Sequence, residues 1–383
     1  MHEFAWNLKI LQLCGIWRPL AWSSGWKKNI YNAYTIFAIF SVYTFTLSEL
    51  IAAAMSIGNL NEAINILFMA LTILGTCYKM TNLVLKRNET IASLEMLNNG
   101  LCRPVADQEI AIQMKFDKRN SKNTLLFCGL VSVAVMTITI GSVFGNVPNR
   151  TLPFKAWLPF DHTSELGFWI GYSHQIWAHG LAATIGGAHD AFFHSFMLQA
   201  CSQLNILKSR LNSIPDVARK ESLISVETRE QLKVRVCVQH HLEIYEFVER
   251  SNGIFSMVIF IQFSISTFVI CVSTYMLSKA NFLSAGFTFL LVYLGCMLVQ
   301  IFLLCWYGDE VITENTNVSD AIYDMDWNSL NQSTKKGLQM MMVRTHHRLR
   351  YDGGFVITLS IESYNSLMKL TYSIYNLLQR TSM

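Results

Sequence analysis

The stretch IYNAYTIFAIFSVYTFTLSELIAAAM, residues 30–55, has one charged side chain, Glu49, among 26 residues. A helix needs about 20 mainly apolar residues to cross the hydrocarbon core of a bilayer, so this stretch predicts a transmembrane helix. Composition agrees, because 52% of the chain is hydrophobic and 15% is charged, whereas soluble domains average about 25% charged residues. Six further windows of this kind follow, at residues 63–85, 124–144, 167–200, 254–277, 282–307 and 355–378.

The second and fourth windows contain ionisable side chains. Lipid offers such groups no hydrogen-bond partner, so within a membrane they face protein or water. We therefore expect them inside a helix bundle. They are Lys79 in the second window and His174, His179, His189, Asp190 and His194 in the fourth.

Positive charge is unevenly divided between the two sides of the predicted membrane. Of the 30 Lys and Arg residues, 24 lie before the first window or in the second, fourth and sixth connections, and four lie on the opposite side. Because Lys and Arg accumulate on the cytoplasmic side, the N-terminus is predicted to be cytoplasmic and the C-terminus extracellular. The start of the chain lacks the pattern of a cleavable signal peptide, so the first window is expected to direct insertion.

This orientation opposes a G-protein-coupled receptor, whose N-terminus is extracellular. The nine cysteines agree, since none falls in an outer loop, where such receptors usually form a disulfide bond. Of the four N-x-S/T sites, Asn88, Asn149, Asn317 and Asn331, the topology places Asn149 outside. We therefore expect that Asn149 alone can be glycosylated.

Four stretches resemble the insect odorant receptor family. The stretch LPFKAWLPFDHTSELGFWIGYSHQIWA (152–178) is similar to the family's second outer loop, and LKILQLCGIWRP (8–19) to its N-terminal helix. The stretch WYGDEVITENTNVSDAIYDMDW (306–327) resembles the cytoplasmic end of its sixth helix, and TLSIESYNSLMKLTYSIYNLLQR (358–380) its last helix. The resemblance covers nearly the whole chain in the right order.

The resemblance implies an odorant-tuning subunit, because the connection at residues 205–253 lacks the long insertion of the family's coreceptor. Such subunits form odorant-gated, non-selective cation channels with the coreceptor, as tetramers in the plasma membrane of olfactory sensory neuron dendrites. The implied partners are coreceptor subunits, a small volatile ligand, lipid and permeating cations, with no nucleic acid, cofactor, metal or enzymatic activity. We expect three parts: helices one to six in residues 1–310, a cytoplasmic assembly segment in 311–350 and a pore-lining helix in 351–383.

The last window carries a polar face. At about 100° per residue, its polar residues fall in a sector of about 100° centred near Glu362. Charged groups at membrane depth cost at least about 2.5–3.5 kcal/mol each, so this face should meet water or polar partners. The family implies a pore wall, with Leu377 as an apolar gate; packing against neighbouring helices is the alternative. The predicted pore and gate residues are Glu362, Lys369, Ser373, Asn376, Leu377 and Arg380.

Residues 329–349 predict a cytoplasmic amphipathic helix rather than a span. Its apolar residues recur at steps of three and four, while Lys335, Lys336, Arg344 and Arg348 keep the other face wet. It could lie on the membrane surface or pack on its counterparts. The family favours the second, as an assembly platform. The predicted assembly residues are Tyr323, Trp327, Met341 and Met342.

The family places its ligand pocket within each subunit, between helices two, three, four and six. Small volatile ligands need compact, mostly apolar pockets with few polar groups. Most apolar residues in a bundle, however, only pack. The predicted ligand-binding residues are Phe68, Met69, Thr72, Met136, Ile140, Tyr172, Ile176, His179, Phe287 and Leu291.

A membrane oxidoreductase and a membrane transporter are the alternative classes of protein. HDAFFH (189–194) has the H-x4-H spacing of a membrane di-iron oxidoreductase, but the H-x-x-H-H boxes of such enzymes are missing. Histidines packed among polar neighbours account for this stretch better. A membrane transporter would usually show inverted repeats with interrupted helices, and the sequence shows none.

Overall fold

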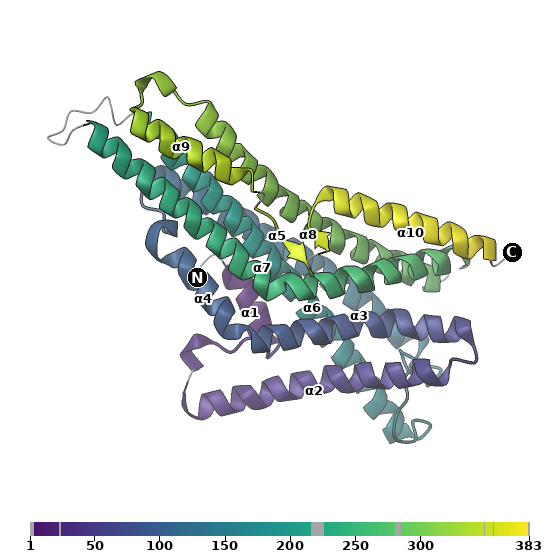
Figure 1. Cartoon of the computed structure of the whole chain (residues 1–383). Coiled ribbons are helices and arrows are strands. Elements are labelled where there is room, and N and C mark those ends of the chain that lie inside the picture. Colours follow the sequence, from purple (N-terminus) through teal and green to yellow (C-terminus); the bar gives the residue numbers. More distant parts are fainter. Residues whose placement is uncertain are drawn as a thin grey trace.

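The structure is a computed structural model that describes residues 4–22, 24–215, 226–279, 285–347, 349–354 and 356–381. Helices joined by turns and loops account for nearly all of these residues (Figure 1). The α-helices are α1 (Ala5–Leu13), α2 (Gly25–Met55), α3 (Leu60–Leu85), α4 (Arg87–Asn98), α5 (Asp107–Gly145), α6 (Glu165–Asn212), α7 (Val226–Lys279), α8 (Ala285–Tyr323), α9 (Gln332–Thr345) and α10 (Ile361–Thr381). The short elements are η2 (Leu20–Trp22), η3 (Gly100–Cys102) and η5 (Trp327–Ser329), with a hairpin of β1 (Asp352–Gly353) and β2 (Ile357–Thr358).

The predicted windows fall on α2, α3, α5, α6, α7, α8 and α10, one window to each helix. Among the described residues, α2, α3, α5, α7 and α8 are long and apolar enough to cross a membrane by composition alone. The helices outrun several windows, because a helix can continue into water while hydropathy marks only its apolar part. The last window differs at its start: β2 precedes a helix that begins at Ile361. Residues 282–284 of the sixth window lie outside the described residues.

The long helices run alongside one another, and their connections gather at two ends of the bundle (Figure 1). The turn between α2 and α3 and the C-terminal end of α10 lie at one end. At the other end α9 packs against the extensions of α7 and α8. There Asn315 of α8 donates a hydrogen bond to the Thr345 carbonyl (3.1 Å), and Tyr245 of α7 donates to the His347 carbonyl (2.9 Å).

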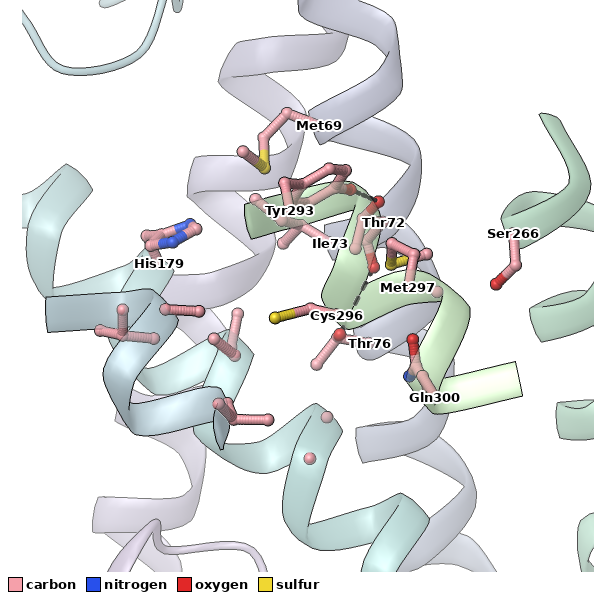
Figure 2. A pocket seen from close by; sticks show the side chains of 18 of the residues that line it. Met69, Thr72, Ile73, Thr76, His179, Ser266, Tyr293, Cys296, Met297 and Gln300 are labelled. Atoms are coloured by element: carbon pink, nitrogen blue, oxygen red, sulfur yellow. Dashed lines mark hydrogen bonds between the residues drawn. The ribbon is translucent and has the colours of Figure 1, made fainter. Parts of the chain in front are cut away.

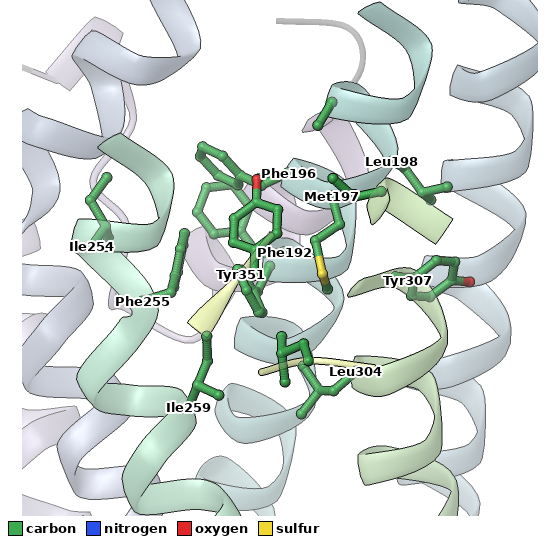
Figure 3. Packing of buried hydrophobic residues seen from close by; sticks show 14 of the residues in the cluster. Phe192, Phe196, Met197, Leu198, Ile254, Phe255, Ile259, Leu304, Tyr307 and Tyr351 are labelled. Carbon is green, nitrogen blue, oxygen red and sulfur yellow. The ribbon is translucent and has the colours of Figure 1, made fainter. Parts of the chain in front are cut away.

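The central element is α6, which contacts α1, α2, α3, α5, α7 and α8. Every residue from Ile185 to Leu204 is buried. Aromatic rings fill the space around this segment (Figure 3): the Phe192 and Phe196 ring centroids are 5.2 Å apart, and Phe196 lies 5.3 Å from Phe255 of α7. Such contacts stabilise beyond area burial by about 0.5–1.5 kcal/mol per pair. We call Phe192, Phe193, Phe196, Phe255 and Tyr351 the aromatic core.

The helix α10 lies at the edge of the bundle against α7 and α8. The segment that leads into it passes close to Gly308 of α8, where an added Cβ would stand 2.5 Å from the Leu359 carbonyl oxygen. Any larger residue at position 308 would displace that backbone, so Gly308 allows α8 and this segment to pack closely. The Ile361 amide also donates to the Asp309 carboxylate (3.4 Å), so the start of α10 is fixed to α8.

Candidate functional site

A cavity of about 150 Å³ lies between α3, α5, α6, α7 and α8 (Figure 2); we call it the deep cavity. An apolar protein cavity of about 150 Å³ can hold benzene, so the deep cavity has room for a molecule of that size. Its lining is mainly apolar, which suits a small organic ligand. The lining includes Met69, Ile73, Val135, Ala182, Cys296 and Met297.

Small residues on α6 shape one wall of the deep cavity. Ala182 and Ala183 face it, and Gly186 and Gly187 follow one turn later. A Cβ at Gly186 would lie 3.1 Å from Thr76, and one at Gly187 would lie 2.9 Å from Val131. The glycines therefore let α3 and α5 approach α6 closely, while the two alanines leave space between the same helices.

The polar groups of the deep cavity differ in how well they are satisfied. The Thr72 hydroxyl and the Tyr293 hydroxyl are hydrogen-bonded to each other (2.5 Å). His179 is 7% exposed, and neither of its ring nitrogens has a hydrogen-bond partner among the described residues. Its ring lies 4.8 Å from that of Phe154. Since a neutral imidazole offers one donor and one acceptor, His179 can bond a hydroxyl or carbonyl group placed in the cavity.

Lys79 of α3, which lines the deep cavity, forms a buried ion pair with Asp190 of α6. Lys79 Nζ lies 2.6 Å from Asp190 Oδ1, and both side chains are buried. The second carboxylate oxygen accepts hydrogen bonds from Gln262 of α7 (3.4 Å) and from Gln300 of α8. Four helices thus meet at one carboxylate. A buried charge is tolerated where it is paired and hydrogen-bonded, so this network accounts for two of the ionisable residues in the predicted windows.

The predicted ligand-binding residues divide into three groups. Met69, Thr72 and His179 line the deep cavity. Phe68 and Tyr172 are buried: the Phe68 ring lies 5.4 Å from that of Tyr293, and the Tyr172 hydroxyl lies 3.2 Å from Ser142. Ile176 and Phe287 are partly buried. The rest lie on the outer surface of the chain, away from the deep cavity: Met136, Ile140 and Leu291.

The sequence reasoning missed the face of α8 that lines the deep cavity. Tyr293, Cys296 and Gln300 stand there at steps of three and four residues, the spacing of one helical face. These polar or polarisable side chains form a stripe within the mainly apolar first half of α8. In the sequence, that stripe indicates the face of α8 that turns inward, and this face differs from the one that carries Leu291.

A second, wider cavity of about 610 Å³ adjoins the deep cavity, since Met69 and Ile138 line both; we call it the outer cavity. It lies between α2, α3, α5, α8 and the loop before α6. That loop is fixed across the bundle: the Gln175 side chain bonds both the amide and the carbonyl of Phe154 (3.1 Å each), and the Trp157 amide donates to the Ser48 carbonyl (2.9 Å).

The histidines of HDAFFH are packed against rings. His194 lies 5.0 Å from Tyr307 and 5.6 Å from Phe127, and His189 lies 5.6 Å from Phe255, measured between ring centroids. Within the part of the chain that the structure describes, no three His, Cys, Asp or Glu side chains gather as metal ligands would.

The sequence profile described as "7tm Odorant receptor" matches residues 59–372. The chain belongs to this odorant receptor family. Odorant receptor Or1 of Anopheles gambiae is 24% identical over 98% of this chain and 95% of its own length. Odorant receptor 2a of Drosophila melanogaster is 24% identical over 98% of this chain and 96% of its own.

The fold is also that of solved family members. The insect olfactory receptor OR5 from Machilis hrabei superimposes with a TM-score of 0.83 at 17% identity, covering 98% of this chain and 97% of that one. Its complex with eugenol gives the same TM-score at 16% identity. The chain is therefore a multi-pass membrane receptor of this family and not an enzyme, which removes the histidine-box interpretation.

In this receptor, α10 turns its predicted polar face away from the bundle. Leu367 and Thr371 are buried against the neighbouring helices. On the opposite side of the helix, Glu362, Lys369 and Ser373 are exposed. Leu377 is 62% exposed and Asn376 partly buried. The side chain of Arg380 lies outside the described residues.

The receptor's α9 buries one face against its own chain, through Thr334, Leu338, Met341 and Thr345. Of the predicted assembly residues, Met341 is 2% exposed and Met342 partly buried, so Met341 leaves no surface for a neighbour. Tyr323 is exposed, and its carbonyl accepts a hydrogen bond from the Trp327 indole (3.0 Å). The exposed apolar side chains of α9 are Met340 and Val343.

Proposed function

We propose that this receptor is the odorant-tuning subunit of a heteromeric, non-selective cation channel that it forms with coreceptor subunits. A small volatile molecule binding in the deep cavity opens the channel. The observation that carries this proposal is a mainly apolar cavity, lined by a histidine with no partner among the described residues, inside a chain of the odorant receptor family. Gating requires that the ligand bind the open state more tightly than the closed state.

The ligand we propose has an apolar body about the size of a benzene ring and one hydroxyl or carbonyl group directed at His179. The volume of the deep cavity sets the size, and the available ring nitrogens of His179 set the polar group. The eugenol complex of a receptor with the same fold supports an organic ligand of this general kind. Selectivity among apolar bodies is modest, since one methylene changes binding by about 1–3 kcal/mol.

The proposed topology has seven transmembrane helices, a cytoplasmic N-terminus and an extracellular C-terminus. The distribution of Lys and Arg supports it, as does the position of α9 at the end of the bundle opposite the C-terminus. We place the receptor in the plasma membrane of olfactory sensory neuron dendrites. Asn149, which is exposed in the loop after α5, is the proposed glycosylation site.

The pore proposal concerns α10 in a tetramer. Glu362, Lys369, Ser373, Asn376 and Arg380 would line the central path, and Leu377 would contribute to an apolar gate that excludes ions by dewetting. The exposure of the polar face, opposite the buried Leu367, supports this. The cytoplasmic segment with Tyr323, Trp327 and Met342 is the proposed assembly region. Met341 packs within the chain, and Met340 and Val343 of α9 supply the available apolar surface.

Expression in oocytes with and without a coreceptor tests the proposal. Alcohols, ketones and hydrocarbons of about benzene size are applied to each. We expect no current from this chain alone and a cation current from the pair. His179→Phe should abolish the preference for alcohols and ketones over the matched hydrocarbons. His174→Phe is the control, because His174 bonds Thr44 (3.1 Å) rather than lining the deep cavity.

Two results would contradict the proposed function. A current that disappears when G-protein signalling is blocked would exclude the channel mechanism. Equal loss of response in the His179 and His174 variants would exclude His179 as the polar contact.

A further inference from the structure

The outer cavity contains a carboxylate without a counter-ion among the described residues. Glu49 of α2 lines this cavity and is 1% exposed. Its Oε2 atom is buried and has no hydrogen-bond partner among the described residues. No ion pair in the described part of the chain includes Glu49. The charged form of a buried carboxyl group in this condition has a large desolvation cost, whereas another buried carboxylate of the bundle, Asp190, is paired with Lys79 (2.6 Å).

The described part of the chain does not supply a cation at this place. Among the described residues that line the outer cavity, the cation is Lys155. Its Nζ lies 2.7 Å from Glu62 Oε1, and 69% of its side chain is exposed. The lysine is therefore directed to the surface of the loop and paired there. Glu49 is left facing a cavity of about 610 Å³, wide enough for an organic molecule.

The rest of the lining suits an organic cation. The aromatic residues Phe68, Phe154 and Phe289 line the same cavity. Aromatic faces attract ammonium groups, by about 0.5–2 kcal/mol depending on exposure, and a carboxylate forms charge-assisted hydrogen bonds with them. Met69, Ile138 and Ile66 offer apolar surface for an alkyl or aryl chain. A carboxylate, several rings and an apolar wall together make a site for an amphiphilic amine.

We propose that the outer cavity binds a protonated organic amine, with Glu49 as the counter-ion of its ammonium group. The site is distinct from the deep cavity, although the two adjoin at Met69 and Ile138. Binding there is a property of this chain and does not depend on the channel mechanism. An amine in the outer cavity neutralises Glu49 and stands at the boundary of the deep cavity.

The test uses the full-length chain in lipid nanodiscs, with hexylamine and hexan-1-ol as probes of similar length and different charge. The concentration dependence of thermal stabilisation gives a Kd for each. We expect Glu49→Gln to weaken hexylamine at least ten-fold and to change hexan-1-ol less than two-fold. Glu165→Gln is the control: it removes an exposed carboxylate (73% exposed) that pairs with Arg150 and does not line the outer cavity, so both values should stay unchanged.

A second measurement needs no variant. On the unmodified chain, hexyltrimethylammonium, whose charge is permanent, should displace hexylamine at concentrations at least ten-fold below those needed with hexan-1-ol. Equal displacement by both compounds overturns the proposal, as does a Glu49→Gln change that weakens hexylamine and hexan-1-ol alike. No binding of hexylamine to the unmodified chain also overturns it. Absence of odorant-evoked current with a coreceptor would contradict only the proposed function.

Discussion

Two stretches of α6 pack in different ways. From Ile185 to Leu204 every residue is buried, and the rings of the aromatic core fill the space around it (Figure 3). The preceding turns present Ala182 and Ala183 to a cavity, and His179 there has no hydrogen-bond partner among the described residues (Figure 2). One helix therefore combines a closed, structural segment with an open segment that a ligand can fill. Stability and recognition should respond to mutations at different places.

The ion pair of Lys79 and Asp190 links the closed stretch to the deep cavity. Lys79 belongs to the lining of the deep cavity, while Asp190 lies within the buried stretch of α6. Through Gln262 and Gln300 the same carboxylate also bonds α7 and α8. The network that includes Lys79 therefore joins four helices beside the deep cavity.

The largest effect on stability is expected when the ion pair between Lys79 and Asp190 is broken. Lys79→Ala leaves Asp190 buried without its counter-ion, and losing one partner of a buried pair costs roughly 3–5 kcal/mol. The melting temperature of the purified receptor in detergent should fall by many degrees. The double variant Lys79→Met/Asp190→Leu removes both charges and should recover much of the loss. A Tm for Lys79→Ala that matches the unmodified chain would show that the pair does not hold the helices.

The next effect separates the two stretches directly. Phe196→Ala in the aromatic core should lower the unfolding free energy by about 3–5 kcal/mol, because the removed ring leaves a void in a closed region. Met69→Ala should cost less than half as much, since Met69 already borders two cavities. It should instead shift the odorant preference toward larger molecules. Thermal melts and dose–response series measure both. Equal destabilisation would remove the distinction between a closed and an open region.

Filling the deep cavity should affect recognition alone. Ala183→Leu adds three carbon atoms to a wall of a cavity of about 150 Å³. We expect at least a ten-fold rise in the EC50 for ligands of benzene size, with normal surface expression. Ala54→Leu, at an exposed position of α2, is the matched control. Unchanged potency in Ala183→Leu would place the ligand elsewhere.

The smallest effect is expected at Thr72. Thr72→Val keeps the volume but removes the hydroxyl that bonds Tyr293 (2.5 Å). A hydrogen bond of this kind contributes about 0.5–1.5 kcal/mol net, so the melting temperature should fall by a few degrees at most. Odorant potency should change by a few-fold, because the freed Tyr293 hydroxyl faces the deep cavity. A fall in melting temperature as large as that of Lys79→Ala would mean that the Thr72–Tyr293 hydrogen bond stabilises the receptor as much as the Lys79–Asp190 ion pair does.

Hydropathy was sufficient to locate the long helices, because an uncharged apolar run of about 20 residues is characteristic of a membrane span. The interior position of Lys79 and Asp190 was also predictable from the cost of exposing them to lipid. Their pairing was not, since 111 residues separate them in the sequence and no local pattern links α3 to α6. The helical extension of α7 back to Val226 was missed because its polar sequence carries no hydropathy signal.

The site was partly predictable for a related reason. The family pointed to the helices that surround the deep cavity, and Met69, Thr72 and His179 do line it. Met136 and Leu291 instead lie on the outer surface, because hydropathy says nothing about which apolar face of a helix turns inward. On α8 the residues that line the deep cavity are the less apolar stripe of Tyr293, Cys296 and Gln300, which the sequence prediction did not use. The contacts that hold the loop beside the outer cavity depend on tertiary structure and had no sequence signal.

Cys296 allows a direct test of whether the activating ligand occupies the deep cavity, because it lines that cavity and is a free, partly buried thiol. The receptor is co-expressed with a coreceptor and treated with methyl methanethiosulfonate, with or without a saturating activating odorant. Mass spectrometry then gives the modified fraction of Cys296. An odorant bound in the deep cavity should slow modification at Cys296 at least five-fold, while Cys128 changes much less. Equal rates at Cys296 with and without the odorant would contradict it.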